Sequence, residues 1–347
     1  MWPANKKIRV MVIDDSLLAR KLIVDGLSRS PRIEIVGTAF NAQDAMAKIG
    51  QMRPDVITCD VEMPGMSGIE FLKRLLPRYQ MPVILVSALN LRVFDALSAG
   101  AVDFVRKPEP GKNEEFIKNL TLKVISAAGA KIRSSPAALT QPGGIMAAPL
   151  LGAQHPGDQV IIGLGASTGG TEATLEVLKR LPADIPGMLI VQHMPTGFTQ
   201  MYAERLNRLC QMEVREAKHG DEVRRGLALL APADYQMRIV RSGTRYTVSC
   251  MQGQKVSGHR PSVDALFFSM AEQVRCKMVG IIMTGMGRDG ADGLLQMRKK
   301  GAYTIGQDKD SCVVYGMPMV AQNIGAVQIQ ASCENIASVL LRHLNQL

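Results

Sequence analysis

The sequence predicts an α/β protein with two doubly wound parallel-sheet domains, the second carrying an inserted β-hairpin. At 347 residues the chain is long for one domain. In both halves, short apolar runs alternate with stretches of helical periodicity, which is the pattern of parallel sheets. A segment rich in Ala, Pro, Gly and Ser interrupts this alternation. We therefore expect domains at residues 1–125 and 158–347, joined by a linker at residues 126–157.

Five apolar runs predict the strands of the first sheet: residues 8–14, 33–39, 54–60, 82–88 and 101–107. The stretches between them, such as SLLARKLIVDGLSRS and GIEFLKRLLPRY, have the periodicity of amphipathic helices. Strands that alternate with helices predict a parallel, doubly wound sheet. In such a sheet ligands bind beyond the carboxyl ends of the strands.

The second half repeats the alternation, with predicted strands at residues 159–165, 187–193, 277–285 and 302–308. Residues 227–250 differ, because MRIV and YTVS flank the short sequence RSGTR. Two β-rich runs around a glycine-containing turn predict a hairpin. We expect it to be an insertion in an otherwise α/β domain.

Composition limits the partners and the compartment. The chain has no apolar run of roughly 18 residues and no secretory signal pattern, so we expect no membrane insertion. The six cysteines form no C-x-x-C pair, which favours a reducing, cytoplasmic location over a disulfide framework or a zinc site. The net charge is +10, but aromatic residues are only 4%, so an acidic protein partner fits at least as well as nucleic acid. We expect a monomer that does not bind nucleic acid.

Carboxylates follow two strands of the first half. Asp14 and Asp15 end the first strand and Asp60 ends the third, so three carboxylates should converge at one edge of the sheet. Oxygen ligands with crowded negative charge suit Mg²⁺. Ser87 and Lys107 end the next two strands and complete a site for a phosphoryl group on a carboxylate. The alternative is that each of these residues is an ordinary cap or strand end.

Residues 1–125 resemble a response-regulator receiver domain through VIDDS, VITCDVEMPGMSG, VILVSA and GAVDFVRKP. The resemblance covers the whole segment and implies that Asp60 accepts a phosphoryl group from a histidine kinase. It also implies that Mg²⁺ binds at Asp14, Asp15, Asp60 and the backbone carbonyl of Glu62.

The same resemblance implies roles for three further residues. Ser87 and Lys107 would contact the phosphoryl group. Phe104 would be the aromatic switch residue, at a position where many receivers have Tyr. A switch at Phe104 would therefore lack a hydroxyl for hydrogen bonding.

The segment GLGASTGG lies between an apolar run and a helix-like stretch. Gly165 to Gly169 fits G-x-S-x-G, in which Ser167 would occupy a sharp strand-to-helix turn. A dinucleotide-binding loop starting at Gly163 is the rival interpretation. It would need glycine where Thr168 stands, and the next strand ends in Gln-His rather than in an acidic residue, so we discount it.

His193 ends the next predicted strand, and Asp289 lies in the glycine-rich segment TGMGRDGADG. A serine nucleophile needs a base, and the base needs an orienting carboxylate, so these residues could form a triad with Ser167. Backbone amides at Thr168 and Met286 could bind the oxyanion. The alternatives stay open from spacing alone, because a histidine at a strand end is often structural, and His219 and His259 are also in predicted loops.

The second half resembles the catalytic domain of chemotaxis protein-glutamate methylesterases through IGLGASTGGTEA, VQHMPTGFT, GHRPSVDALF, IIMTGMGRDGADGL and YGMPMVA. The resemblance implies that Ser167 is the nucleophile, His193 the general base and acid, and Asp289 its orienting residue, with the Met286 amide binding the oxyanion. The implied substrate is a glutamate γ-methyl ester on cytoplasmic helices of chemoreceptors, and the esterase reaction needs no cofactor. Related enzymes also deamidate glutamine, which the sequence leaves undecided.

Three further interpretations remain at this point. Arg260 and Asp264 could line the substrate groove, although RPSVD also suits a helix start. A phosphorylation-controlled transcription factor fits poorly, because the second half shows no helix-turn-helix pattern. A non-catalytic adaptor with a vestigial triad would differ from an enzyme in keeping its activity after Ser167→Ala.

Overall fold

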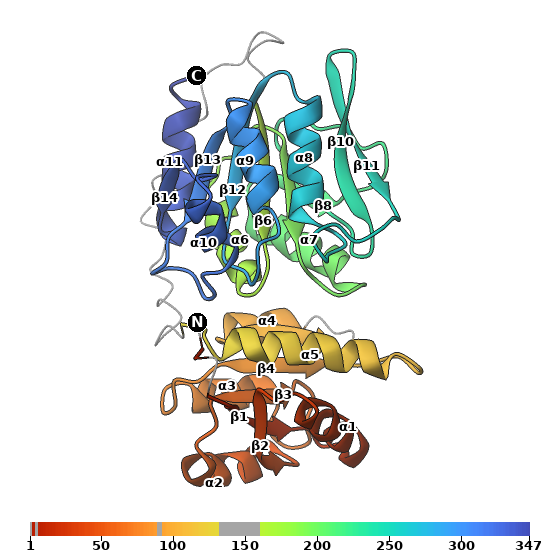
Figure 1. The fold of residues 1–347 in the computed structure, drawn as a ribbon, viewed down its shortest axis with the longest axis vertical. Coiled ribbons are helices and arrows are strands. Elements are labelled where there is room, and N and C mark those ends of the chain that lie inside the picture. The colour runs from red at the N-terminus through yellow and green to blue at the C-terminus, as the bar shows by residue number, and fades with distance from the viewer. Residues whose placement is uncertain (1, 4–5, 89–91, 132–159) are drawn as a thin grey trace. The chain divides into compact units, whose positions relative to one another are not determined.

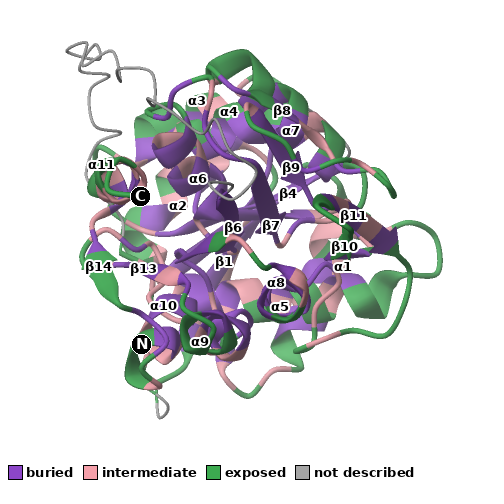
Figure 2. Cartoon of the chain, turned by 90° about the horizontal axis from the view of Figure 1, so that it is seen from above, coloured by how far each residue is buried: buried purple, intermediate pink, exposed green. Residues whose placement is uncertain are grey.

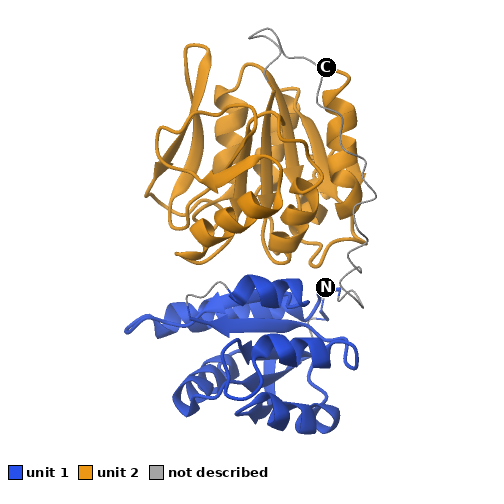
Figure 3. Ribbon diagram, turned by 180° about the vertical axis from the view of Figure 1, so that it is seen from behind, with its two compact units in different colours: residues 1–141 blue, residues 142–347 orange. Residues whose placement is uncertain are grey.

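The computed structural model describes residues 2–3, 6–88, 92–131 and 160–347, and the chain forms two compact units, residues 1–141 and 142–347 (Figure 3). The linker predicted at residues 126–157 lies largely outside the described residues. Its described part begins inside a helix that ends at Ala127. In the described part of the chain, no helix is both long and apolar enough to cross a membrane.

The first unit is a five-stranded parallel sheet with the strand order β2-β1-β3-β4-β5 (Figure 1). All five predicted strands are confirmed: β1 (Ile8–Ile13), β2 (Ile33–Ala39), β3 (Val56–Asp60), β4 (Val83–Ser87) and β5 (Asp103–Arg106). The helices are α1 (Leu17–Ser28), α2 (Ala42–Met52), α3 (Gly68–Leu75), α4 (Arg92–Ser98) and α5 (Asn113–Ala127). α1 contacts α5, and α3 contacts both α2 and α4. The helices therefore form two groups, one on each face of the sheet.

Short polar side chains start several of these helices. Ser16, Asn41 and Ser67 accept hydrogen bonds from amides of the first turns of α1, α2 and α3. At α3 the Glu70 side chain completes a capping box. Because each helix begins directly after a strand and its loop, the carboxyl ends of the strands and the helix N-termini lie at one edge of the sheet.

The second unit is built on a seven-stranded parallel sheet with the order β14-β13-β12-β6-β7-β9-β8. Its strands are β6 (Val160–Ala166), β7 (Met188–Gln192), β8 (Glu213–Glu216), β9 (Leu227–Leu230), β12 (Lys277–Ile282), β13 (Tyr303–Gln307) and β14 (Ile329–Ala331). Its helices are α6 (Gly170–Leu178), α7 (Phe198–Leu209), α8 (Val263–Gln273), α9 (Ala291–Lys299), α10 (Met317–Asn323) and α11 (Cys333–Leu344). The chain leaves β6 in one direction through β7 and returns on its other side as β12. Ligands bind at such switch points in open α/β sheets.

The predicted hairpin is confirmed as β10 (Gln236–Ser242) paired antiparallel with β11 (Arg245–Met251). Three strands of the main sheet were not predicted. β8 is a short edge strand with the polar sequence EVRE, and β14 has three residues. β9 is the apolar run LALL, which is fully buried and therefore shows none of the alternation that marks a half-exposed strand.

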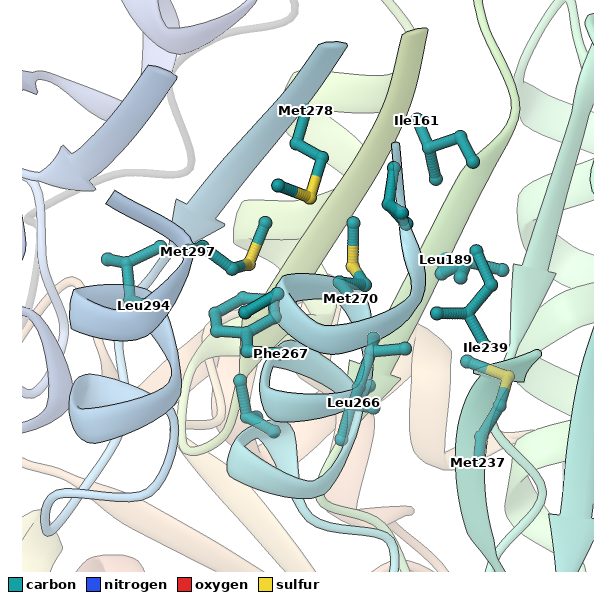
Figure 4. Packing of buried hydrophobic residues seen from close by; sticks show 14 of the residues in the cluster. Ile161, Leu189, Met237, Ile239, Leu266, Phe267, Met270, Met278, Leu294 and Met297 are labelled. Atoms are coloured by element: carbon teal, nitrogen blue, oxygen red, sulfur yellow. The ribbon is translucent and has the colours of Figure 1, made fainter. Parts of the chain in front are cut away.

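The main core of the second unit lies where α8 packs between the parallel sheet and the hairpin (Figure 4). Leu266, Phe267 and Met270 of α8 join Met237 and Ile239 of β10 in this cluster, and all five are buried. Fully burying a side chain of this size contributes about 1.5–3 kcal/mol. The hairpin thus fixes the position of α8 above the sheet.

Helix α8 approaches β6 closely, and this explains two glycines of the GLGASTGG segment. A Cβ atom at Gly165 would lie 2.2 Å from Cγ1 of Val263, and one at Gly163 would lie 2.6 Å from Sδ of Met270. Figure 2 shows β6 among the buried elements, and all seven of its residues are buried. These glycines therefore serve helix packing and do not form a nucleotide loop.

Candidate functional site

The predicted carboxylate cluster forms at the ends of β1 and β3. One ligand atom from each of Asp14, Asp15 and Asp60 lies within 4.8 Å of the other two. Asp14 and Asp60 are buried and Asp15 is exposed, so the cluster opens to solvent on one side. Carboxylate oxygens at this spacing fit Mg²⁺, which keeps several waters when it binds to proteins. The Glu62 amide donates to Oδ1 of Asp60 (3.2 Å), whereas a metal contact of its carbonyl stays a prediction.

Lys107 joins the cluster from the end of β5. Its Nζ lies 2.5 Å from Oδ2 of Asp60 and 3.0 Å from Oδ2 of Asp14. Burial raises the pKa of Asp60, with a further increase from Asp14, against the lowering effect of Lys107. Burial works to lower the pKa of Lys107, but the two carboxylates raise it overall, so the ammonium stays charged beside Asp60.

Ser87 and Phe104 lie where the sequence places them, at the end of β4 and in β5. The Ser87 hydroxyl is buried and has no hydrogen-bond partner in the described structure. A buried polar atom without a partner is costly, and a phosphoryl oxygen would satisfy it. Phe104 is buried and meets the ring of Phe94 edge-on at 6.4 Å between centroids.

In the second unit, Ser167 occupies the turn between β6 and α6. Its amide donates to the Thr284 carbonyl (2.9 Å), and its own carbonyl accepts from the Gly170 amide (2.7 Å). Gly169 has φ 76°, a left-handed conformation that favours glycine. A Cβ atom at Gly285 would lie 2.7 Å from Cβ of Ser167 and 2.3 Å from Sδ of Met317. Glycine at position 285 therefore leaves the space that the serine turn needs.

His193 is the neighbour of Ser167 across the sheet. Ala166 pairs with Gln192 in the β6–β7 register, and the His193 amide donates to the Ala166 carbonyl (3.1 Å). Residues 167 and 193 therefore follow directly after a pair of residues that lie opposite each other. The Gln192 side chain also donates to the Ser167 carbonyl (2.8 Å). The ends of adjacent parallel strands thus hold the two residues side by side.

The imidazole of His193 is held by Asp289. Its Nε2 lies 2.7 Å from Oδ2 of Asp289, and the His193 side chain is 10% exposed. Its Nδ1 is buried and has no hydrogen-bond partner among the residues that the structure describes. The Ser167 hydroxyl is therefore not bonded to Nδ1 in this conformation, and such catalytic hydrogen bonds are commonly long before substrate binds.

Asp289 is buried and receives four hydrogen bonds. Besides His193, the donors are the Ser262 hydroxyl (2.7 Å), the Val263 amide (2.8 Å) and the Asp264 amide (2.9 Å). Burial acts to raise the pKa of Asp289, but the hydrogen bond and charge of His193 and the other donors lower it overall. Asp289 is thus an ionised carboxylate at the N-terminus of α8, where the helix dipole favours negative charge.

The prediction that Asp264 lines a substrate groove is wrong, because this residue is 1% exposed. Its carboxylate accepts from the Gly293 amide (2.8 Å) and the Ser257 hydroxyl (2.6 Å), so it joins the first turn of α9 to the loop that precedes α8. Arg260 instead pairs with Asp234, with Nε 2.9 Å from Oδ1. The alternative for RPSVD, a helix start, is the one observed, with Ser262 as the N-cap of α8.

Ser262 and Gln236 support the site and were not among the residues predicted from the sequence. Ser262 precedes VDAL as a typical N-cap, a signal that marks the helix start but not the contact with Asp289. Gln236 lies on β10 and accepts from the Ser262 amide (2.9 Å), a contact that no local pattern indicates.

Thr168 and Met286, the predicted oxyanion donors, lie on the two segments that meet at Ser167. Thr168 follows the serine directly, and its carbonyl accepts from the Thr284 hydroxyl (3.0 Å). Met286 lies two residues beyond Thr284, whose carbonyl binds the Ser167 amide. Both positions fit the predicted role, which stays a prediction.

These features define a class of protein: a response regulator whose receiver shares one chain with a hydrolase domain built on a parallel sheet. Comparison with known families gives the same two parts, since residues 10–120 match the response regulator receiver domain and residues 162–340 match the CheB methylesterase family. The chain belongs to the CheB methylesterase family.

Relatives of the chain extend over its whole length. It is 50% identical to protein-glutamate methylesterase/protein-glutamine glutaminase 2 of Syntrophomonas wolfei, covering 99% of both chains. A similarly named protein of Syntrophotalea carbinolica is 44% identical over 98% of this chain and 99% of its own. Among solved structures, the CheB methylesterase catalytic domain of Thermotoga maritima aligns with a TM-score of 0.52 at 32% identity, covering 53% of this chain and 98% of that domain.

Proposed function

We propose that this protein is a phosphorylation-activated serine esterase that removes methyl groups from glutamate γ-methyl esters on cytoplasmic helices of chemoreceptors. The observation that supports this best is the arrangement of Asp289, His193 and Ser167. The carboxylate lies 2.7 Å from one ring nitrogen, the other ring nitrogen is buried with no hydrogen-bond partner among the described residues, and the strands that end at residues 166 and 192 are paired neighbours. The names of the two relatives support the substrate.

The reaction follows from this arrangement. The Ser167 hydroxyl attacks the ester carbonyl while Nδ1 of His193 takes its proton, and Asp289 stabilises the imidazolium that forms. Backbone amides at Thr168 and Met286 bind the oxyanion, an interaction that typically contributes about 10²–10³ in rate. His193 returns the proton to the leaving methoxide, so methanol departs and an acyl-serine remains.

Water completes the cycle. His193 takes a proton from a water molecule, whose oxygen attacks the acyl carbonyl, and the proton then passes to Ser167 as the bond to its oxygen breaks. The product is a glutamate side chain. An amide substrate would follow the same steps with ammonia as the leaving group, and the relatives' names support glutamine deamidation as a second activity.

The receiver unit supplies the control. Asp60 accepts a phosphoryl group from a histidine kinase, with Ser87 and Lys107 placed to contact its oxygens and Phe104 as the switch residue. Mg²⁺ at Asp14, Asp15, Asp60 and the Glu62 carbonyl would neutralise charge during phosphoryl transfer.

Release of methanol from receptor carrying labelled methyl esters tests the esterase. We expect the full-length chain, supplied with a small-molecule phosphodonor, to release methanol, and Ser167→Ala to lower the rate by at least about 10³-fold. Ser242→Ala, at an exposed serine that ends β10, is the matched control and should keep the wild-type rate. If Ser167→Ala released methanol as fast as the wild type, the proposed mechanism would be wrong.

A further inference from the structure

We propose that His259 is a positioning residue for His193, acting through its ring; this inference rests on the proposed function. The two imidazoles are stacked, with centroids 3.9 Å apart and planes at 8°. His259 belongs to the loop between the hairpin and α8, and it is partly buried. No part of the proposed triad includes it.

The hydrogen bond to Asp289 alone does not fix the orientation of His193. A ring held through one nitrogen can rotate about the Nε2–Oδ2 direction, and within the described part of the chain Nδ1 has no hydrogen-bond partner that would oppose this rotation. A flat ring stacked on one face restricts rotation and keeps the plane in one orientation. His259 therefore helps to direct Nδ1 toward the serine, where small errors of orientation reduce the rate strongly.

His259 is itself held by the inserted hairpin. Its amide and carbonyl exchange hydrogen bonds with Val256 (2.9 and 3.1 Å), and its carbonyl also accepts from Nε2 of Gln236 (2.9 Å). Oε1 of the same Gln236 accepts from the Ser262 amide. One buried glutamine of β10 thus anchors both the histidine that stacks on His193 and the serine that binds Asp289. The hairpin is the common support of both contacts to the general base.

Three single variants of the full-length chain test the proposal, with initial rates of methanol release from methylated receptor measured in the presence of a phosphodonor. His259→Ala removes the stacked ring and should lower kcat by about 2- to 10-fold with KM changed less than twofold. His259→Phe keeps a flat ring at this position and should recover kcat to within about twofold of the wild type. His219→Ala, at an exposed loop histidine of the same unit, is the matched control and should leave both constants unchanged.

Several outcomes would overturn the proposal. They are an unchanged kcat in His259→Ala, an effect on KM alone, and equal losses in the Ala and Phe variants with intact circular dichroism. A double-variant cycle adds a second criterion: if His259 and Asp289 act on the same ring, the effects of His259→Ala and Asp289→Asn should be less than additive. Additive effects would argue against it.

A measurement without turnover separates this inference from the proposed function. In a crystal structure of full-length His259→Ala, the His193 ring should leave its present plane or occupy more than one orientation. An unchanged, singly oriented ring would contradict the stacking role whether or not the protein proves to be an esterase. Conversely, wild-type protein that releases no methanol would contradict the proposed function alone.

Discussion

At the scale of single residues, Ser262 connects two stabilising roles. Its hydroxyl donates to Oδ1 of Asp289 and accepts from the Ala265 amide in the first turn of α8. The side chain is fully buried, so bulk water cannot replace either hydrogen bond when a substitution removes it. The same atom therefore binds both the Asp289 carboxylate and the first turn of α8.

Two substitutions separate these roles. Ser262→Ala should be less stable than Ser262→Gly by about 1 kcal/mol, because glycine is an acceptable N-cap and alanine is not. Both variants lose the hydrogen bond to Asp289, so both should lower kcat by about tenfold, the effect of a hydrogen bond to a charged group. Hydrogen exchange over residues 262–273 reports the stability, and methanol release reports kcat. Wild-type kcat in the glycine variant would show that Ser262 is a cap and nothing more.

At the scale of elements, α8 and α9 bind each other's N-termini. Asp289 precedes α9 and accepts from two amides at the start of α8, while Asp264 in the first turn of α8 accepts from the Gly293 amide of α9. This exchange satisfies amides that have no partner within their own helix. It also fixes the Asp289 carboxylate relative to both helices.

The buried Asp264 makes this pair of helices sensitive to pH. Burial raises its pKa above the ordinary 3.8, in spite of the hydrogen bonds from Ser257 and Gly293. A raised folded-state pKa means that the folded state binds the proton more tightly than the unfolded state. Protonation of Asp264 therefore stabilises the folded state. This stabilisation is fully present below pH 3.8 and is lost as pH rises through the folded-state pKa. The wild type should therefore gain stability relative to Asp264→Asn as pH falls from neutral toward 3.8. Opening free energies from hydrogen exchange of α8 in the full chain test this, and a pH-independent difference would contradict it.

The elements that carry the candidate site were predictable because each motif residue follows an apolar run. Ser167 and His193 come directly after buried strands of one sheet, and Asp60 ends a buried strand of the other sheet, so the sheet edge at which each residue lies follows from parallel topology. The support of the site was not predictable in the same way. Gln236 lies on a hairpin that is distant in the chain from Asp289, and Asp264 was assigned to a groove because its polarity in sequence gives no sign of its burial.

At the scale of the whole molecule, two sites with different chemistry share one chain. The described residues place Asp60 in one compact unit and Ser167 in the other, and relatives that match the full length keep both parts together. A phosphoryl group on Asp60 can affect hydrolysis only through a difference in free energy between states of the whole chain. The coupling between the two sites is therefore measurable as the ratio of the methanol-release rates with and without a phosphodonor.

With Mg²⁺ and a small-molecule phosphodonor, methanol release by the full-length chain should rise by about 5- to 150-fold, the usual range of coupling between two sites. Asp60→Asn removes the carboxylate that accepts the phosphoryl group, so its rates with and without phosphodonor should be equal. Asp25→Asn, at an exposed carboxylate of α1, is the matched control and should respond as the wild type does. Removing Mg²⁺ with a chelator should abolish the response of the wild type, because the crowded carboxylates at Asp60 then repel the incoming phosphoryl group. A wild-type ratio of one under conditions where mass spectrometry shows phosphorylated Asp60 would exclude control of the esterase by the receiver.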